Sequence, residues 1–285
     1  MTQVTNPTTP ASSLPGGNGG STVIGTTTDN RLNGGPGNDI ILTFGGNDVV
    51  AGGGGNELII TGGGNDSIGG GDGNDTVFSG SGADVVAGGS GDDVIFAGKG
   101  DDLVDGGDGN DLISGDKGND TVLGGAGNDT VFGGMGNDIV GGGAGNDSLF
   151  GGKDNDTVNG GDGNDFISGD RGSDVLTGGA GSDTFYFFSS GGDYGVDTIT
   201  DFTPGEDKIR LKSGGVFSGL GTSFEASEFV VVSNFNAATP GSATTNKLVY
   251  DPTSGTLFFN GNSGVLTVAQ LQPGLTITSN NFELF

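Results

Sequence analysis

The chain has 285 residues, 66 of them glycine, and only 31% are hydrophobic, which excludes the large core of an ordinary globular domain and favours a repetitive architecture. Nine basic residues face 36 acidic ones, so the formal net charge of −27 makes nucleic acid a poor partner and cations good ones. Because the chain has no histidine and no cysteine, catalytic triads, Cys/His dyads and thiolate metal sites are excluded, and we expect no enzyme.

Residues 1–24 are rich in Thr, Pro, Ser and Gly and lack the basic start and apolar run of an N-terminal secretory signal. This composition predicts a flexible N-terminal lead that is too short for a catalytic domain. Nowhere does the chain approach the roughly 18 consecutive apolar residues of a membrane-spanning helix, so we expect no transmembrane segment.

A repeat of nine residues fills the middle of the chain. Seventeen nonamers follow one another over residues 34–186 without insertion or deletion, and a degenerate unit, 25–33, precedes them. Position four is glycine except at Asp154, and position eight is apolar in every unit. Position six is acidic in all seventeen units: Asp39, Asp48, Glu57, Asp66, Asp75, Asp84, Asp93, Asp102, Asp111, Asp120, Asp129, Asp138, Asp147, Asp156, Asp165, Asp174 and Asp183.

Each nonamer divides into a turn and a strand. Six residues rich in Gly, Asn and Asp favour a turn, and the three that follow, such as Thr130–Phe132, favour an extended strand. Since strand side chains alternate, position eight points inward and positions seven and nine point outward. Two units then form one coil of 18 residues, and stacked coils give two parallel sheets.

Stacking also places acids in two rows, because units on the same side lie two repeats apart. Neighbouring carboxylates at one strand spacing repel by roughly 1 kcal/mol even in water. A hard divalent cation between successive turns would reverse this, because carboxylates and turn carbonyls form the all-oxygen shell that calcium prefers. We therefore predict about 12 to 15 Ca²⁺ ions from the fifteen same-side pairs that seventeen units provide (17 − 2). The alternative is a metal-free glycine-rich solenoid with a solvated acidic edge.

These residues resemble the G-G-x-G-x-D-x-U-x repeat of RTX calcium-binding proteins over residues 34–186. The resemblance implies a right-handed parallel β-roll, all-β in class, in which the position-six carboxylates and the backbone carbonyls of neighbouring turns hold Ca²⁺ along each edge. Glu57 and Asp154 depart from the pattern, so the sites made with their same-side neighbours are left open.

Residues 187–285 follow a different pattern. "VDTITDFTPGEDKIRL" (196–211) predicts a strand, a Pro-Gly turn and a strand, and "LVYDPTSGTLFF" (248–259) predicts a hairpin. A repeat array needs a closed end, so we expect a β-rich C-terminal cap rather than an independent binding module. The final "NNFELF" resembles the C-terminal signals of type I secretion substrates, which makes the type I machinery the expected partner.

At position nine, aromatic residues are confined to one side of the coil. Phe78, Phe96, Phe132 and Phe150 lie whole coils apart on that side, whereas the other side carries mainly small or polar residues. The column is interpreted either as a stacked ladder that stiffens one sheet or as a face for self-association or surface docking.

Together these features predict an extracellular calcium-binding protein that folds on binding Ca²⁺ after secretion, with a structural or surface-associated role. One alternative is a secreted glycan- or surface-binding protein whose active part is 187–285. Another is a cytoplasmic calcium buffer.

Overall fold

The structure, a computed structural model, describes residues 2–4, 19–188, 195–212, 217, 220, 224–240, 246–261 and 264–285. Most of the expected N-terminal lead, residues 1 and 5–18, lies outside this description, as do parts of 187–285. Regular helix in the described residues is confined to short 3-10 turns such as η2 (Ala226–Glu228) and η4 (Ser279–Asn281). None of these residues forms a helix that is long and apolar enough to cross a membrane.

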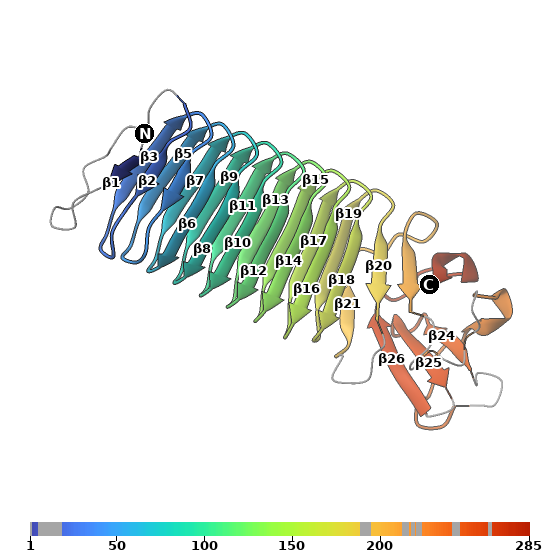
Figure 1. Cartoon of the computed structure of the whole chain (residues 1–285). Helices are drawn as coiled ribbons and strands as arrows, with labels where there is room; N and C mark the ends of the chain where they lie inside the picture. The colour runs from blue at the N-terminus through green and yellow to red at the C-terminus, as the bar shows by residue number, and fades with distance from the viewer. Residues whose placement is uncertain are drawn as a thin grey trace. The chain divides into compact units, whose positions relative to one another are not determined.

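The chain divides into two compact units, residues 1–149 and 150–285, which are described separately. In the first unit the chain alternates between two parallel sheets, drawn in blue and green in Figure 1. One sheet is called the even sheet here because its repeat strands have even numbers, and the other is called the odd sheet. The even sheet contains β1 (Thr2–Val4), β2 (Thr22–Ile24), β4 (Ile40–Leu42), β6 (Leu58–Gly63), β8 (Thr76–Ser81), β10 (Val94–Lys99), β12 (Leu112–Lys117) and β14 (Thr130–Met135). The odd sheet contains β3 (Arg31–Pro36), β5 (Val49–Gly54), β7 (Ser67–Asp72), β9 (Val85–Ser90), β11 (Leu103–Asp108), β13 (Thr121–Ala126) and β15 (Ile139–Ala144).

The register of the strands confirms the 18-residue coil. Val104 on β11 is opposite Val86 on β9 and Val122 on β13, each 18 residues away. On the other sheet, Ile95 on β10 is opposite Val77 and Ile113 in the same way. The expected all-β, two-sheet parallel solenoid is therefore present, and it matches a β-roll.

The strands are longer than the sequence pattern predicts. Most span six residues rather than three, because each continues from position seven through position three of the next unit. The prediction of three-residue strands was wrong, since the opening glycines of each unit extend the strand before the chain turns. Inward-facing residues alternate along it, as at Asp111, Ile113 and Gly115, which are all buried.

The core consists of one side chain per nonamer. The position-eight residues, from Ile41 and Val50 to Phe185, are 0–3% exposed. Burying each contributes roughly 1.5–3 kcal/mol. In the degenerate unit 25–33, Leu32 is also buried and is opposite Val50, so this unit has the same geometry.

The second unit begins within β16 (Ser148–Lys153) and contains both repeat strands and the C-terminal segment. Its even-sheet strands are β18 (Phe166–Arg171), β20 (Thr184–Phe187), β22 (Lys208–Leu211) and β27 (Phe282–Leu284). Its odd-sheet strands are β17 (Thr157–Asp162), β19 (Val175–Ala180), β21 (Asp197–Ile199), β26 (Gly264–Gln270), β25 (Thr256–Gly261), β24 (Lys247–Asp251) and β23 (Phe229–Val231).

Both strand predictions after the repeats are confirmed. β24 and β25 pair in antiparallel fashion as the predicted hairpin, and β26 adds a third antiparallel strand. The two strands of 196–211 are β21 and β22, but they extend opposite sheets, because β21 pairs in parallel with β19 and β22 with β20.

Candidate calcium sites

The position-six acids are buried inside the coil. All seventeen predicted ligands are only 1–3% exposed: Asp39, Asp48, Glu57, Asp66, Asp75, Asp84, Asp93, Asp102, Asp111, Asp120, Asp129, Asp138, Asp147, Asp156, Asp165, Asp174 and Asp183. The alternative of a solvated acidic edge does not describe these side chains. Carboxylates almost never occur fully buried unless a cation or hydrogen bonds compensate for the lost hydration.

One oxygen of each typical carboxylate is satisfied by the neighbouring coil. Oδ1 of Asp111 accepts the backbone N–H of Asp93 at 2.7 Å, and Oδ1 of Asp129 accepts that of Asp111 at 2.8 Å. In the other row, Oδ1 of Asp120 accepts the N–H of Asp102 at 2.8 Å. The structure thus brings together the same-side acids 18 residues apart that the repeat predicts.

The second oxygen has a different environment. In many of these acids, Oδ2 is buried and has no hydrogen-bond partner among the described residues: Asp39, Asp48, Asp66, Asp75, Asp84, Asp93, Asp102, Asp111, Asp120, Asp129 and Asp174. A buried acceptor without a partner costs about 1–3 kcal/mol, and more when it is charged. A row of such oxygens is unfavourable unless cations accompany it.

Backbone carbonyls converge on the same places. A Cβ added to Gly88 would lie 2.3 Å from Oδ2 of Asp93 and 2.4 Å from the carbonyl oxygen of Gly106. A Cβ on Gly106 would meet Oδ2 of Asp111 at 2.3 Å and the Gly124 carbonyl at 2.4 Å. In units that open with glycine, as at Gly88 and Gly106, this position therefore leaves a space bordered by one carboxylate and one carbonyl oxygen.

This donor set fits calcium. All the atoms are hard oxygens, and Ca²⁺ combines carboxylate with carbonyl ligands in a flexible shell. Within the described part of the chain, no group of three or more His, Cys, Asp or Glu side chains has the geometry to hold a metal ion. Backbone carbonyls from neighbouring turns must therefore complete each shell.

Burial also changes the protonation of these acids. Loss of hydration and, to a smaller extent, neighbouring carboxylates raise the pKa of Asp93 and of Asp102 to about 7 against the lowering effect of a backbone hydrogen bond. The pKa values of Asp120 and Asp129 rise to about 6, again chiefly through burial. Without a cation the folded chain therefore keeps these carboxyl groups protonated up to a higher pH than in water, whereas calcium requires the charged form.

The two departures from the repeat pattern keep the fold. Glu57 is buried like the aspartates, and neither of its carboxylate oxygens has a hydrogen-bond partner among the described residues. Burial and the charge of Asp75 raise the pKa of Glu57 to about 8. Asp154 adopts the left-handed backbone, with φ of 76°, that glycine has at this position of the other units.

A second ladder, at position five, was not predicted from the sequence. Oδ1 of Asn110 accepts the backbone N–H of Asn128 at 2.9 Å, and Oδ1 of Asn128 accepts that of Asn146 at 2.8 Å. This ladder points toward the next coil, whereas the position-six ladder points toward the preceding one. The Asn that precedes the position-six acid in twelve of the seventeen units was the available signal.

Two acids beyond the repeats extend the rows in the second unit. Oδ1 of Asp197 accepts the N–H of Asp174 at 3.1 Å, and Oδ1 of Asp207 accepts the N–H of Asp183 at 3.0 Å. Sequence periodicity missed them because their spacings are 23 and 24 residues. The recognisable signal is an acid two residues before a buried isoleucine, as in Asp207 and Ile209.

No curated protein matches the chain in sequence. Among solved structures, an extracellular lipase, LipA, from Serratia marcescens is 16% identical, and the match covers 93% of this chain and 40% of the lipase chain. Its TM-score is 0.23, which is too low to relate the two folds.

The family model of the RTX calcium-binding nonapeptide repeat (4 copies) matches residues 15–50, 51–86, 78–113, 105–140, 114–149, 132–167 and 159–187. These matches span more than half of the chain, and repeats of this kind bind Ca²⁺ at multiple sites. The chain belongs to the family of proteins with RTX calcium-binding nonapeptide repeats.

Proposed function

We propose that this protein is extracellular, folds when it binds Ca²⁺ after secretion, and has a structural or surface-associated role rather than a catalytic one. RTX repeat proteins are typically secreted calcium binders, which supports secretion and calcium binding in this proposal. The proposal also states that the seventeen position-six acids are the ligands and that about 12 to 15 ions bind. In this proposal 1–24 form a lead, 25–186 the calcium-binding roll and 187–285 its cap.

The observation that carries the proposal is the row of buried carboxylate oxygens without partners. Asp93, Asp111 and Asp129 each have one oxygen hydrogen-bonded to a neighbouring coil and one without a hydrogen-bond partner in the described part of the chain. The formal charge of −27 adds repulsion throughout the chain. Without cations these terms oppose folding, so calcium binding and folding become one equilibrium.

Circular dichroism tests this coupling. The far-UV spectrum of the full chain is recorded in excess EDTA and during titration with CaCl₂, and MgCl₂ serves as the control because Mg²⁺ accepts this flexible shell poorly. We expect little strand signal in EDTA, a cooperative gain with calcium and a much weaker response to magnesium. Equal strand content in EDTA and in calcium would contradict the proposal.

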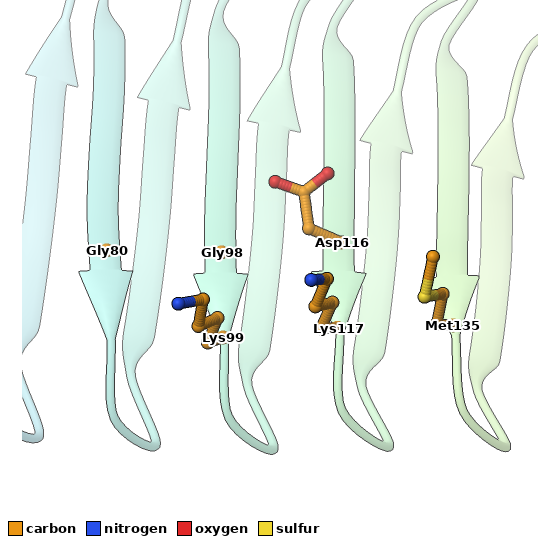
Figure 2. Close-up of a pocket in the computed structure, with 6 residues that line it drawn as sticks. All are labelled: Gly80, Gly98, Lys99, Asp116, Lys117 and Met135. Atoms are coloured by element: carbon orange, nitrogen blue, oxygen red, sulfur yellow. The ribbon is translucent and has the colours of Figure 1, made fainter.

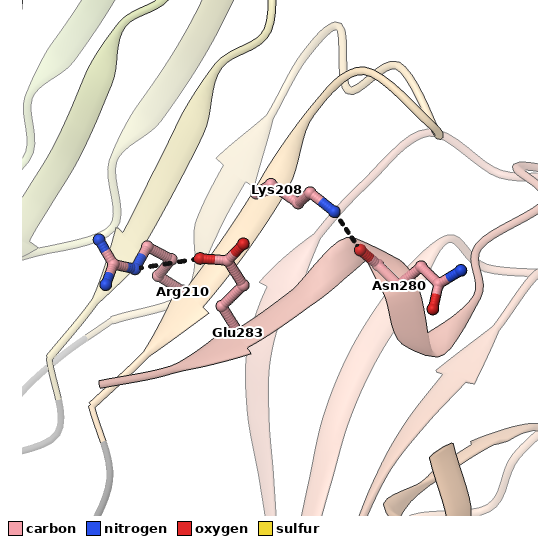
Figure 3. Close-up of polar contacts among 4 residues, drawn as sticks. All are labelled: Lys208, Arg210, Asn280 and Glu283. Atoms are coloured by element: carbon pink, nitrogen blue, oxygen red, sulfur yellow. Dashed lines mark hydrogen bonds and ion pairs between the residues drawn. The ribbon is translucent and has the colours of Figure 1, made fainter. Parts of the chain in front are cut away.

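A type I secretion route is part of this proposal, and it rests on the resemblance of "NNFELF" to signals of that kind. In the fold, Phe282–Leu284 form β27, where Glu283 pairs with Arg210 at 3.5 Å (Figure 3). The ring of Phe285 lies 4.0 Å from that of Tyr186. A signal at "NNFELF" would thus be available only before folding, as in a chain held unfolded by low cytoplasmic calcium. The test is export of the full chain by a type I system, with Phe282→Ser and Leu284→Ser as variants. Unchanged export of both would count against this route.

A second candidate function concerns the C-terminal region. A hollow of about 480 Å³ is lined by Pro204, Gly205, Lys208, Thr276, Thr278, Asn280 and Asn281. Lys208 donates a hydrogen bond from Nζ to the carbonyl of Asn280 at its edge (Figure 3). Polar groups around a hollow favour a glycan or surface ligand for residues 187–285. Glycan binding by the full chain that disappears in Lys208→Gln, with calcium-dependent folding unchanged, would favour this candidate.

A further inference from the structure

At position three of the repeats, basic residues are confined to one side of the coil. At position three, the even-sheet strands β10 and β12 carry Lys99 and Lys117, and the corresponding strands β16 and β18 end in Lys153 and Arg171. The odd-sheet strands carry no basic residue at this position, and three of them, β7, β11 and β17, end in aspartate. In a chain with only nine basic residues, four in one column form a local exception to the acidic surface.

In the first unit these lysines border a hollow of about 330 Å³ on the even sheet. It is lined by Gly80, Gly98, Lys99, Asp116, Lys117 and Met135, which Figure 2 draws on neighbouring strands. Lys99 and Lys117 are directly opposite each other in the register, and neither forms an ion pair with another described residue. Like charges directly opposite on adjacent strands repel, and an anion between them would remove that repulsion.

Two strands leave the hollow open at position two of the repeat. A Cβ added to Gly80 or to Gly98 would lie 2.1 or 2.2 Å from a carbonyl oxygen of the preceding coil, and both residues have φ of 104°. On β12 the equivalent position is Asp116, an L-residue with φ of 72°, and its Oδ1 accepts a hydrogen bond from Oγ of Ser114 at 2.5 Å. An acidic acceptor thus lines the same hollow as the two lysines.

An apolar surface adjoins the hollow. The rings of Phe78 and Phe96 stack at 5.2 Å with an interplanar angle of 7°, and each ring lies two residues before Gly80 or Gly98 on the same strand. Residues two apart share a face of a strand. Phe78 is 38% exposed. Stacked rings, cations and a hydroxyl acceptor together match a sugar that has an apolar face, hydroxyl groups and a carboxylate.

We propose that this hollow of the even sheet binds a carboxylated sugar unit of an acidic polysaccharide. Lys99 and Lys117 would hold the carboxylate, Asp116 would accept a hydrogen bond from a hydroxyl group, and the Phe78–Phe96 stack would contact the apolar face of the sugar ring. The inference goes beyond the structural role proposed above, which requires no such ligand. It also places a glycan site in the repeats rather than in residues 187–285.

Charge complementarity favours this occupant over a second copy of the chain. A polyanion would meet the cationic pair of Lys99 and Lys117 here. Bound calcium would offset most of the formal net charge of −27, which would otherwise repel a polyanion. Binding of a long polymer therefore depends on the calcium-loaded state, and this dependence rests on the proposed function. A short oligomer depends less on the global charge, because screening limits such interactions to roughly 8–10 Å at physiological salt.

The test uses the full chain in calcium, after circular dichroism has established that each variant is folded under those conditions. Trigalacturonate, which is acidic, and maltotriose, which is neutral, are titrated by calorimetry at fixed calcium, with heats of titration into calcium buffer subtracted. The variant is Lys99→Gln with Lys117→Gln, and the matched control is Lys212→Gln with Lys247→Gln, which changes the net charge equally. Asp116→Gly is a second variant that restores the glycine of the repeat and is expected to keep the fold.

We expect the acidic trisaccharide to bind wild type and the control pair within about twofold of each other. The Lys99 and Lys117 variant should bind at least about tenfold more weakly, and Asp116→Gly about threefold to tenfold more weakly. Equal affinity of wild type for the neutral trisaccharide, or unchanged affinity in both variants, would overturn the proposal. Sedimentation without sugar tests whether a second copy of the chain occupies this face. If wild type is a dimer that Lys99→Gln with Lys117→Gln dissociates, the face belongs to a second copy and the glycan assignment is overturned.

Discussion

The repeats and the β24–β25 hairpin of the later segment use aspartate in opposite ways. In the repeats, Asp93 and Asp111 are buried with one oxygen hydrogen-bonded and the other without a partner among the described residues. In the later segment, the carboxylate of Asp251 accepts three backbone N–H groups, from Asn234 at 3.0 Å, Phe235 at 3.2 Å and Thr253 at 2.9 Å. The comparison teaches that burial of an acid by itself does not indicate a metal; the state of its second oxygen does.

The pKa values of Asp93 and Asp251 shift in opposite directions, because the two carboxylates accept different numbers of hydrogen bonds. Burial raises the pKa of Asp93 to about 7, since one backbone hydrogen bond does not compensate for lost hydration. Burial acts the same way on Asp251, but three backbone hydrogen bonds and one from Ser254 outweigh it and lower its pKa. The repeats therefore need an external cation, whereas the turn at Asp251 is satisfied by the chain itself.

Calcium removal should separate the two regions most strongly. In EDTA we expect residues 34–149 to lose nearly all amide protection, because their buried carboxylates lose the compensating charge. The antiparallel strands β24, β25 and β26 should keep a measurable part of theirs. Hydrogen exchange with mass spectrometry, with and without calcium, measures both regions in one sample. Full amide protection of residues 34–149 in EDTA would contradict the expected difference between the two regions.

Single acid substitutions should give the next largest effect. Asp111→Asn removes a charge from two adjacent sites and should raise the calcium midpoint of folding several-fold. Asp251→Asn should leave this midpoint within about twofold and lower the free energy of unfolding in calcium by about 1–3 kcal/mol, because it weakens three backbone hydrogen bonds. Calcium titrations and urea unfolding at saturating calcium distinguish the two. An equal shift of the calcium midpoint in both variants would contradict the comparison.

The contribution to stability should depend on pH with opposite signs for the repeat acids Asp93 and Asp102 and for Asp251. For Asp93 and Asp102 the folded pKa of about 7 exceeds the ordinary value of 3.8, so their contribution to the metal-free fold is fully present below 3.8 and is lost as pH rises through about 7. In EDTA the strand signal in circular dichroism should therefore increase as the pH is lowered from 8 to 4. For Asp251 the folded pKa is lowered, so its contribution is present above 3.8 and is lost as pH falls through the folded value.

Calcium-dependent folding should respond to pH in the reverse sense, because the calcium ion competes with protons for the same carboxylates. The calcium concentration at the folding midpoint should increase as pH falls from 7.5 to 5.5. Circular dichroism titrations at several pH values measure this, with urea unfolding of Asp251→Asn as the internal reference. A midpoint that does not change with pH would indicate that these acids are charged without calcium.

The position-five ladder should have the smallest effect. Asn119→Ala removes an acceptor for the N–H of Asn137, which lies 2.9 Å away, and should cost about 0.5–1.5 kcal/mol of unfolding free energy in calcium. Ala83 interrupts the ladder naturally, since alanine cannot accept the N–H of the next coil. Ala83→Asn should therefore stabilise the roll by up to about 1 kcal/mol. Opposite signs for the two changes in thermal unfolding would support the ladder, and equal signs would reject it.

Much of this architecture was predictable because the repeat is local and strict. The fixed period of nine predicted the 18-residue coil, the alternation of sheets and the burial of residues such as Val104. It also predicted which acids become neighbours, as with Asp93 and Asp111. Strand length was mispredicted, because whether glycines extend a strand or form a turn depends on pairing with the adjacent coil rather than on their own preference.

The sequence by itself determined the period, the side of the coil on which each acid lies and the chemistry of the donors, because one residue type recurs at one spacing through seventeen units. Only the tertiary structure decided that Asp197 and Asp207 extend the acid rows across irregular spacings, that Asp251 is satisfied without a cation, and that Lys99 and Lys117 border one hollow. These features depend on which oxygens and ammonium groups the packing of neighbouring coils brings together. Where the strict period ends, the spacing along the chain no longer indicates which residues become neighbours.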